Sequence, residues 1–134
     1  MKLKRVDHVG VIVANLMQAR HLMEEGFGLT LDRDLQMPDL IAAFLKCGDT
    51  DVELIEVTDP EMRSRRLGDQ VARVEHIAFE VESMAETQIA LAALGIKTTG
   101  PPRTGGPFTS VWTVAETSGG VMYQFMERTT APER

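Results

Sequence analysis

Two segments with the same order of polar and apolar residues open the two halves of the chain. Residues 7–13 and 75–81 each begin with an acid and a histidine and continue as a β-branched, apolar run. Such runs predict strands, because β-branched side chains pack well on a pleated surface. A stretch with helical periodicity follows each run, at residues 16–25 and 84–94. We expect each helix to end at the glycine that comes next, since glycine accepts the left-handed conformation that closes a helix.

The later part of each half repeats as well. Residues 48–56 and 119–127 each run from a glycine turn into a strand, with a polar residue in mid-strand and a glutamate three residues later. A further strand is expected before each of them, at residues 41–46 and 109–115, with hairpin chemistry in the turns between. Each half therefore predicts a strand, a helix and then two or three strands.

This repeat predicts an α+β fold made of two tandem βαβββ modules. Module 1 covers about residues 3–58 and module 2 about residues 73–128, together forming a single domain over residues 1–134. The charged joint between them contains a pattern for a short helix around residues 61–67. The glycines and prolines of residues 100–107 predict a loop, because these residue types disfavour regular strand pairing.

Composition narrows the class of protein. The chain has 134 residues, of which 43% are hydrophobic and 25% charged, a usual balance for a globular protein. The single cysteine, Cys47, cannot form an internal disulfide, which favours a reducing compartment. No apolar run approaches the roughly 20 residues that cross a bilayer, and the start of the chain does not resemble a signal peptide. We expect a cytoplasmic protein with no membrane partner.

The formal net charge of −6 argues against a nucleic-acid partner, because binding to a phosphate backbone needs a basic face. One local exception is the basic cluster Arg63, Arg65 and Arg66. It has two interpretations, either a solvated loop or helix end, or a contact for an anionic substrate tail such as a phosphate.

Four polar residues lie at matching places in the two copies: His8 with His76, and Glu53 with Gln124. Because side chains alternate between the faces of a strand, His8 and His76 are expected on the face opposite the apolar one. Glu53 is expected to share a face with Ile55, and Gln124 to share one with its neighbouring methionines. If a pseudo-twofold axis relates the copies, each offers one imidazole and one side-chain oxygen to a shared site. Two neutral imidazoles, a carboxylate and an amide would leave a divalent ion with about one positive charge, suited to polarising a carbonyl.

Each of these residues also has a structural interpretation. A single histidine on a strand is often hydrogen-bonded and inert, which applies to His8 and His76 alike. Glu53 is compatible with the surface of a half-exposed strand. Gln124, between methionines, is compatible with a buried amide that has local partners. The coincidence of all four at repeat-related positions favours the metal site.

The same residues resemble the vicinal oxygen chelate superfamily, which includes glyoxalases, bleomycin resistance proteins and dioxygenases. The resemblance covers residues 3–128 and is nearest to the methylmalonyl-CoA epimerase and glyoxalase-like branch, on residues 48–56 and 75–81. It implies paired βαβββ modules that form an open, cup-shaped mixed sheet around one divalent metal ion, with Zn, Ni, Co, Mn and Fe as the candidates. The implied ligands are His8, Glu53, His76 and Gln124.

The resemblance implies a metal-dependent lyase or isomerase acting on a small carbonyl or enolisable substrate, similar to methylmalonyl-CoA epimerase or lactoylglutathione lyase. The last ligand is usually a glutamate in the epimerase branch. Gln124 can coordinate a metal but cannot take a proton, and Glu56 is expected on the face opposite Glu53, so the general base stays unassigned. The competing hypotheses are a metal-free protein that sequesters a drug or natural product, and an iron-dependent ring-cleaving dioxygenase.

Large residues near the implied cup are candidates for a substrate pocket. They are Met37, Phe44, Arg103, Phe108, Trp112 and Met122. Most are apolar, and methionines suit an adaptable cavity for a small-molecule substrate; a core position is the competing interpretation for each. Family habit and an open sheet edge also predict a homodimer.

Overall fold

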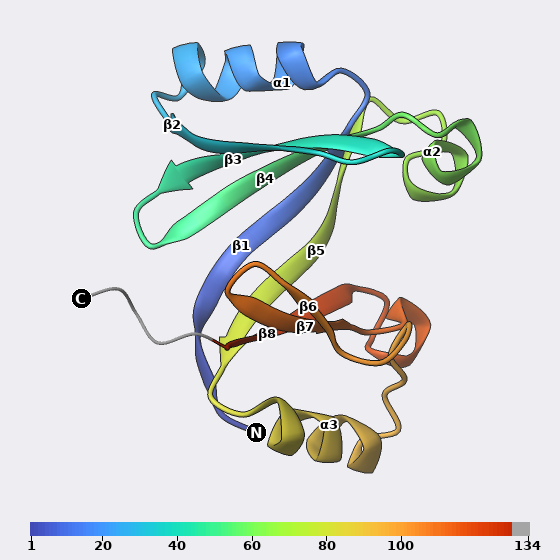
Figure 1. The fold of residues 1–134 in the computed structure, drawn as a ribbon. Helices are drawn as coiled ribbons and strands as arrows, with labels where there is room; N and C mark the ends of the chain where they lie inside the picture. The colour runs from blue at the N-terminus through green and yellow to red at the C-terminus, as the bar shows by residue number, and fades with distance from the viewer. Residues whose placement is uncertain (130–134) are drawn as a thin grey trace. The chain divides into compact units, whose positions relative to one another are not determined.

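A computed structural model describes residues 1–129. Its secondary structure contains two copies of the predicted repeating unit. The elements are β1 (Leu3–Val13), α1 (Leu16–His21), η1 (Leu22–Gly26), β2 (Thr30–Gln36), β3 (Leu40–Cys47), β4 (Thr50–Val57), α2 (Pro60–Arg66), β5 (Ala72–Val81), α3 (Met84–Ala93), β6 (Arg103–Gly105), β7 (Phe108–Trp112), η2 (Ala115–Thr117) and β8 (Met122–Arg128) (Figure 1). The order strand, helix, three strands occurs in β1 to β4 and again in β5 to β8. This confirms the α+β class and the βαβββ modules.

The chain divides into two compact units. Unit 2 is His8–Glu75, and unit 1 consists of Met1–Asp7 and His76–Arg134. The chain passes between the units within β1, after Asp7, and within β5, after Glu75.

In unit 2 the strands follow the order β2-β3-β4-β1, with β1 parallel to β4 and the other pairs antiparallel. Helix α1 packs on one face of these strands (Figure 1), against a core that includes Val13, Leu45 and Leu54. A second core on the other face contains Ile12 and Ile55, together with residues at and just after helix α2. The predicted alternation of faces along β1 and β4 is therefore confirmed.

Unit 1 repeats this arrangement. Its strands follow the order β5-β8-β7-β6, with β5 parallel to β8 and the other pairs antiparallel. Helix α3 packs through Met84 and Leu91 against Val81, Val111 and Phe125. The face of β5 and β8 that carries the candidate ligands points away from this core, because side chains alternate along a strand.

The repeated glutamate near the end of each module holds the start of a helix. The Glu56 carboxylate accepts a hydrogen bond from the Leu16 amide at 2.8 Å, and the Glu127 carboxylate accepts one from the Met84 amide at 2.6 Å. The first amides of a helix have no partner within it, and a carboxylate there also meets the positive end of the helix dipole. Both glutamates therefore have a structural role at the start of a helix. Glu56 faces α1 rather than the side of the strand that holds Glu53.

Replacing Glu56 or Glu127 with alanine is expected to lower the free energy of unfolding by about 1–2 kcal/mol each, the cost of losing a helix cap or a charged hydrogen bond. Glu127→Gln is expected to lose less, because its amide oxygen can still accept the hydrogen bond. Guanidinium denaturation measures these changes, with the exposed Glu25→Ala as control. Equal stability of Glu127→Ala and Glu25→Ala would contradict this role.

Two strand predictions were wrong. Arg103–Gly105, expected in a loop, forms β6 and pairs with β7, because these three residues lie between the prolines and need no buried side chain. The strand expected over residues 109–115 ends at Trp112 and is followed by η2. The short helix between the modules is present as α2. None of the helices within residues 1–129 has the length and hydrophobicity that crossing a bilayer requires.

Candidate metal-binding site

Unit 2 brings His8 and Glu53 together. Gly10 of β1 pairs with Glu53 of β4, so His8 lies two residues earlier on the same face. The distance from His8 Nε2 to Glu53 Oε1 is 3.3 Å, and the two residues are 3% and 8% exposed. An imidazole nitrogen and a carboxylate oxygen are both donors that divalent transition metals and zinc accept.

Phe44 supports this pair from the neighbouring strand. It lies opposite Glu53 in the register of β3 with β4, and its ring meets the His8 ring edge-on with centroids 5.5 Å apart. The Arg33 guanidinium stacks on Phe44, with Cζ 3.9 Å from the ring centroid. Phe44, one of the predicted pocket residues, thus contacts both the His8 ring and a guanidinium group.

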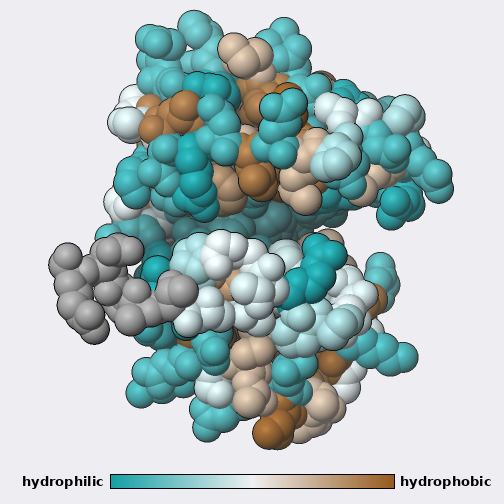
Figure 2. Space-filling view, in the orientation of Figure 1, coloured by the Kyte–Doolittle hydropathy of each residue, from teal (hydrophilic) through white to brown (hydrophobic). Residues whose placement is uncertain are grey.

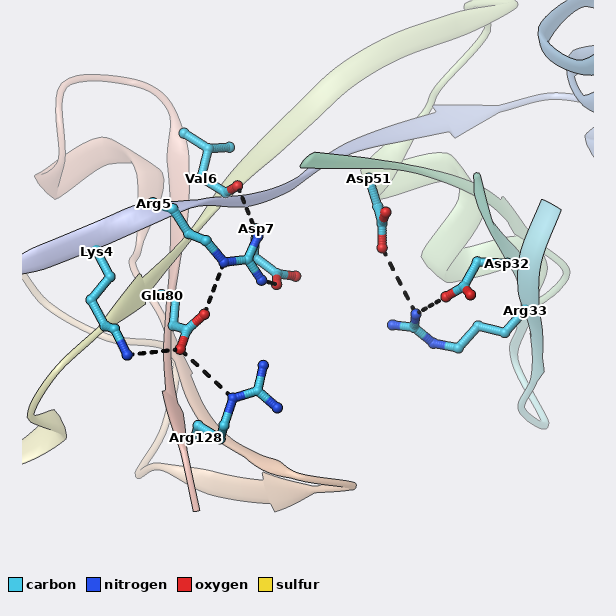
Figure 3. Close-up of polar contacts among 9 residues, drawn as sticks. All are labelled: Lys4, Arg5, Val6, Asp7, Asp32, Arg33, Asp51, Glu80 and Arg128. Atoms are coloured by element: carbon cyan, nitrogen blue, oxygen red, sulfur yellow. Dashed lines mark hydrogen bonds and ion pairs between the residues drawn. The ribbon is translucent and has the colours of Figure 1, made fainter. Parts of the chain in front are cut away.

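A register shift in β2 decides which residue reaches Phe44. The pairing of β2 with β3 slips by one position before Arg33, which leaves Asp32 as the extra residue. A bulge of this kind re-aims the side chains that follow it. Here it places a guanidinium, rather than a carboxylate, opposite Phe44. Arg33 also forms ion pairs with Asp32 at 2.7 Å and Asp51 at 3.9 Å (Figure 3).

Unit 1 holds the equivalent residues, His76 and Gln124, on neighbouring strands. Ala78 of β5 pairs with Gln124 of β8, so His76 lies two residues earlier on the same face, in the same relation as His8 to Gly10 and Glu53. His76 is 4% exposed and Gln124 7%. The two units thus present the same pair of positions on their first and last strands.

Ser110 orients the Gln124 amide. Gln124 Nε2 donates a hydrogen bond to Ser110 Oγ on β7 at 3.2 Å, so the nitrogen end of the amide is engaged and the carbonyl oxygen is the atom left to act as a ligand. Ser110 was not among the residues predicted from the sequence. The only signal there was a polar residue on a strand whose partner strand carries a candidate ligand.

The remaining pocket candidates lie on the same faces as the candidate ligands of their own unit, except Met37, which follows the end of β2. Met122 pairs with His76 and Trp112 with Gln124, while Phe108 lies further along β7. Arg103 stacks on Trp112, with Cζ 5.6 Å from the ring centroid.

The arginines of the basic cluster of α2 form hydrogen bonds mainly with other residues of unit 2. Arg63 donates to two backbone carbonyl groups, at 2.9 and 3.3 Å. Arg66 binds the buried carboxylate of Glu75 with two nitrogens, at 2.7 and 2.8 Å, and this hydrogen bonding raises the pKa of the Arg66 guanidinium. Arg65 alone is exposed. These contacts favour a structural role for the cluster over binding of an anionic tail.

An apolar pocket of about 530 Å³ lies on the other face of unit 1, next to α3. Its lining includes Phe79, Leu91, Tyr123 and Phe125, which alternate with the candidate ligands along β5 and β8. Exposed hydrophobic residues continue over α3, and Figure 2 shows hydrophobic surface there. This pocket contains none of His76, Gln124 and Ser110.

The sequence matches the family model described as the glyoxalase/bleomycin resistance protein/dioxygenase superfamily over residues 7–113. The chain belongs to this superfamily. The match includes most of the first copy of the repeat and the earlier part of the second, with His8, Glu53 and His76, while Gln124 lies beyond it. It confirms the resemblance seen in the sequence. No curated protein sequence matches the chain.

Solved structures with the same fold include two epimerases. Methylmalonyl-CoA epimerase from Mycobacterium tuberculosis is 20% identical, with a TM-score of 0.84 over 97% of this chain and 90% of that one. A variant of the Streptomyces coelicolor enzyme in complex with 2-nitronate-propionyl-CoA is 18% identical, with a TM-score of 0.83 over 99% and 100%. A hypothetical protein from Bacillus halodurans is 22% identical, with a TM-score of 0.82 over 97% and 98%. At these identities the likeness confirms the glyoxalase-like fold.

Proposed function

We propose that His8, Glu53, His76 and Gln124 bind one divalent metal ion, and that the protein is a metal-dependent lyase or isomerase acting on a small carbonyl or enolisable substrate. The observation that carries the proposal is the equivalence of the two pairs. Each unit supplies one buried imidazole and one buried side-chain oxygen from matching places on its first and last strands.

The donor set suits a transition metal or zinc. Imidazole nitrogens bind Zn, Ni, Co and Fe well, and carboxylate and amide oxygens also accept Mn. In unit 2 the close approach of His8 Nε2 and Glu53 Oε1 places two donors side by side. In unit 1 the hydrogen bond from Gln124 Nε2 to Ser110 leaves the side-chain oxygen of Gln124 as the donor atom for a metal. Such pre-orientation of ligands by their neighbours is typical of metal sites in proteins.

When bound, the ion would supply Lewis-acid polarisation of a substrate carbonyl. The chain's own residues would hold and surround the ion. Phe44 keeps water from one side of His8, and Trp112 lies opposite Gln124 at the equivalent place in the other unit's strands. Neither Gln124, an amide, nor Glu56, bound to the start of α1, is the proton acceptor. The homodimer expected from the sequence stays a prediction, supported by the unpaired outer edges of β2 and β6.

Ser110→Ala is expected to weaken metal binding by about 10-fold, the lower end of the range for residues that orient metal ligands. The amide of Gln124 would then rotate freely and present its oxygen for only part of the time. Isothermal titration with Co²⁺ measures the change. Thr109→Ala, a substitution on the neighbouring position whose side chain faces the other way, is the control. Equal affinity in Ser110→Ala and Thr109→Ala would rule out an orienting role for Ser110.

Solvent exchange tests the proposed reaction class. The metal-loaded protein is incubated in D₂O with methylmalonyl-CoA, the ligand of an epimerase with this fold, and NMR follows deuterium at the α-carbon. Exchange that requires added metal and is lost in His8→Ala is the expected result for an enzyme that labilises this proton. Exchange equal to that of buffer would exclude this thioester as a substrate, and exchange that persists without metal would contradict the metal-dependent mechanism.

A further inference from the structure

A buried carboxylate in unit 1 forms ion pairs with three cationic side chains. Glu80 on β5 lies 3.4 Å from Lys4 Nζ, 3.0 Å from Arg5 Nε and 3.8 Å from Arg128 Nε (Figure 3). Arg5 also pairs with Asp7 at 2.6 Å. Three cations thus meet two carboxylates, so this cluster holds one positive charge in excess within a chain whose net charge is −6.

Arg128 has the longest of the three contacts with Glu80. Its distance of 3.8 Å from Glu80 exceeds that of a hydrogen bond, and its side chain is 37% exposed. The guanidinium stacks on Phe108, with Cζ 4.6 Å from the ring centroid. In Figure 3 the Nε atom turns toward Glu80 and the two terminal nitrogens point away from it. Stacking fixes a guanidinium in one plane while its N–H edge stays able to donate.

A second arginine is held in the same way on the other side of β7. Arg103 of β6 stacks on Trp112, while Arg128 of β8 stacks on Phe108. The strand registers place both arginines on the face that carries Gln124, because Arg103 pairs with Ser110, and Arg128 lies four residues after Gln124 on β8. Two stacked guanidinium groups therefore flank the aromatic residues next to a candidate metal ligand.

We propose that this face of unit 1 binds an anionic group of the substrate, a carboxylate or a phosphate, with Arg128 as the main contact and Arg103 as the second. A planar guanidinium matches either group with two parallel N–H donors. This inference rests on the proposed function, because it specifies the substrate of the proposed reaction as an anionic carbonyl compound. The anion contact itself involves only residues of unit 1.

The test uses the full-length, metal-free protein and the emission of Trp112, its only tryptophan. Malonate is titrated at constant ionic strength and compared with neutral malonamide of similar shape. We expect a saturable change with malonate and none with malonamide. Arg128→Gln is expected to weaken malonate binding by about 10-fold, the loss of a charge-assisted hydrogen bond, with partial recovery in Arg128→Lys. Arg65→Gln, an exposed arginine of unit 2, is the control and should not change the affinity.

Two outcomes would overturn the inference: no saturable response to malonate in the wild type, or the same affinity in Arg128→Gln as in Arg65→Gln. Thermal melting checks that Arg128→Gln folds, which is expected because Glu80 keeps Lys4 and Arg5. A separate Co²⁺ titration of the wild-type protein distinguishes the two proposals. In the wild type, metal binding without a response to malonate leaves the proposed metal site standing and removes the anion site, and a saturable response to malonate without metal binding removes the metal site alone.

Discussion

His8→Ala is expected to weaken the binding of Co²⁺ or Zn²⁺ by more than 100-fold, beyond the roughly 10–100-fold that residues behind the ligands contribute. The substitution removes one of two nitrogen donors and leaves the Glu53 carboxylate without the imidazole that lies 3.3 Å from it. His76→Ala is expected to have an effect of the same size, because the repeat gives His76 the equivalent position in unit 1. Calorimetric titration of metal-free protein measures both affinities.

The third histidine of the chain provides the matched control. His21 is exposed on α1, so His21→Ala removes an imidazole without touching either pair of candidate ligands. Its affinity should equal that of the wild type. Loss of binding in His8→Ala together with full binding in His76→Ala would show that the two copies do not contribute equally, and unchanged binding in both would remove the site.

Arg66→Met is expected to lower the free energy of unfolding by about 2–3 kcal/mol, somewhat less than the roughly 3–5 kcal/mol for breaking a fully buried ion pair, because Arg66 is partly exposed. Methionine keeps much of the packing of the side chain, so the loss reports mainly the two hydrogen bonds to Glu75. Glu75 is buried and immediately precedes His76. For a chain of this size the melting temperature should fall by about 6–12 °C.

Arg65→Met is the control for this substitution, since Arg65 is its exposed neighbour on α2. It should change stability by no more than about 0.5 kcal/mol. Arg66→Lys should lie between the two, because an ammonium keeps the charge but cannot make two parallel hydrogen bonds. If Arg66→Met were as stable as Arg65→Met, the ion pair would not hold this part of unit 2 together.

The repeat could be predicted because its strands and helices pack their own apolar faces. In residues 7–13 and 75–81, the alternation of polar and apolar side chains that marks such a face is visible in the sequence. Strand β2 carries none, since six of its seven residues are exposed, and it exists because β3 offers it a backbone to pair with. Strand β6 is three exposed residues long and depends on β7 in the same way. Pairing with the next strand of the chain overrode local preference in both.

The candidate ligands could also be predicted, because they lie at matching positions of the repeat. The contacts that their neighbours make could not be predicted. The hydrogen bond from Gln124 to Ser110 and the stacking of Arg33 on Phe44 join different strands, and the second depends on a bulge that the sequence of β2 does not mark. The repeated glutamates were visible in the sequence, but their role at the helix starts became clear only when Glu56 was found bonded to Leu16.

Crystals of the protein loaded with Co²⁺ or Zn²⁺ and measured at the absorption edge of the metal test the central claim most directly. The expected result is one anomalous peak per chain, about 2.0–2.2 Å from a nitrogen of His8, a nitrogen of His76, a carboxylate oxygen of Glu53 and the amide oxygen of Gln124. A peak bound instead by His21 or Cys47, or no peak in metal-saturated crystals, would contradict the account.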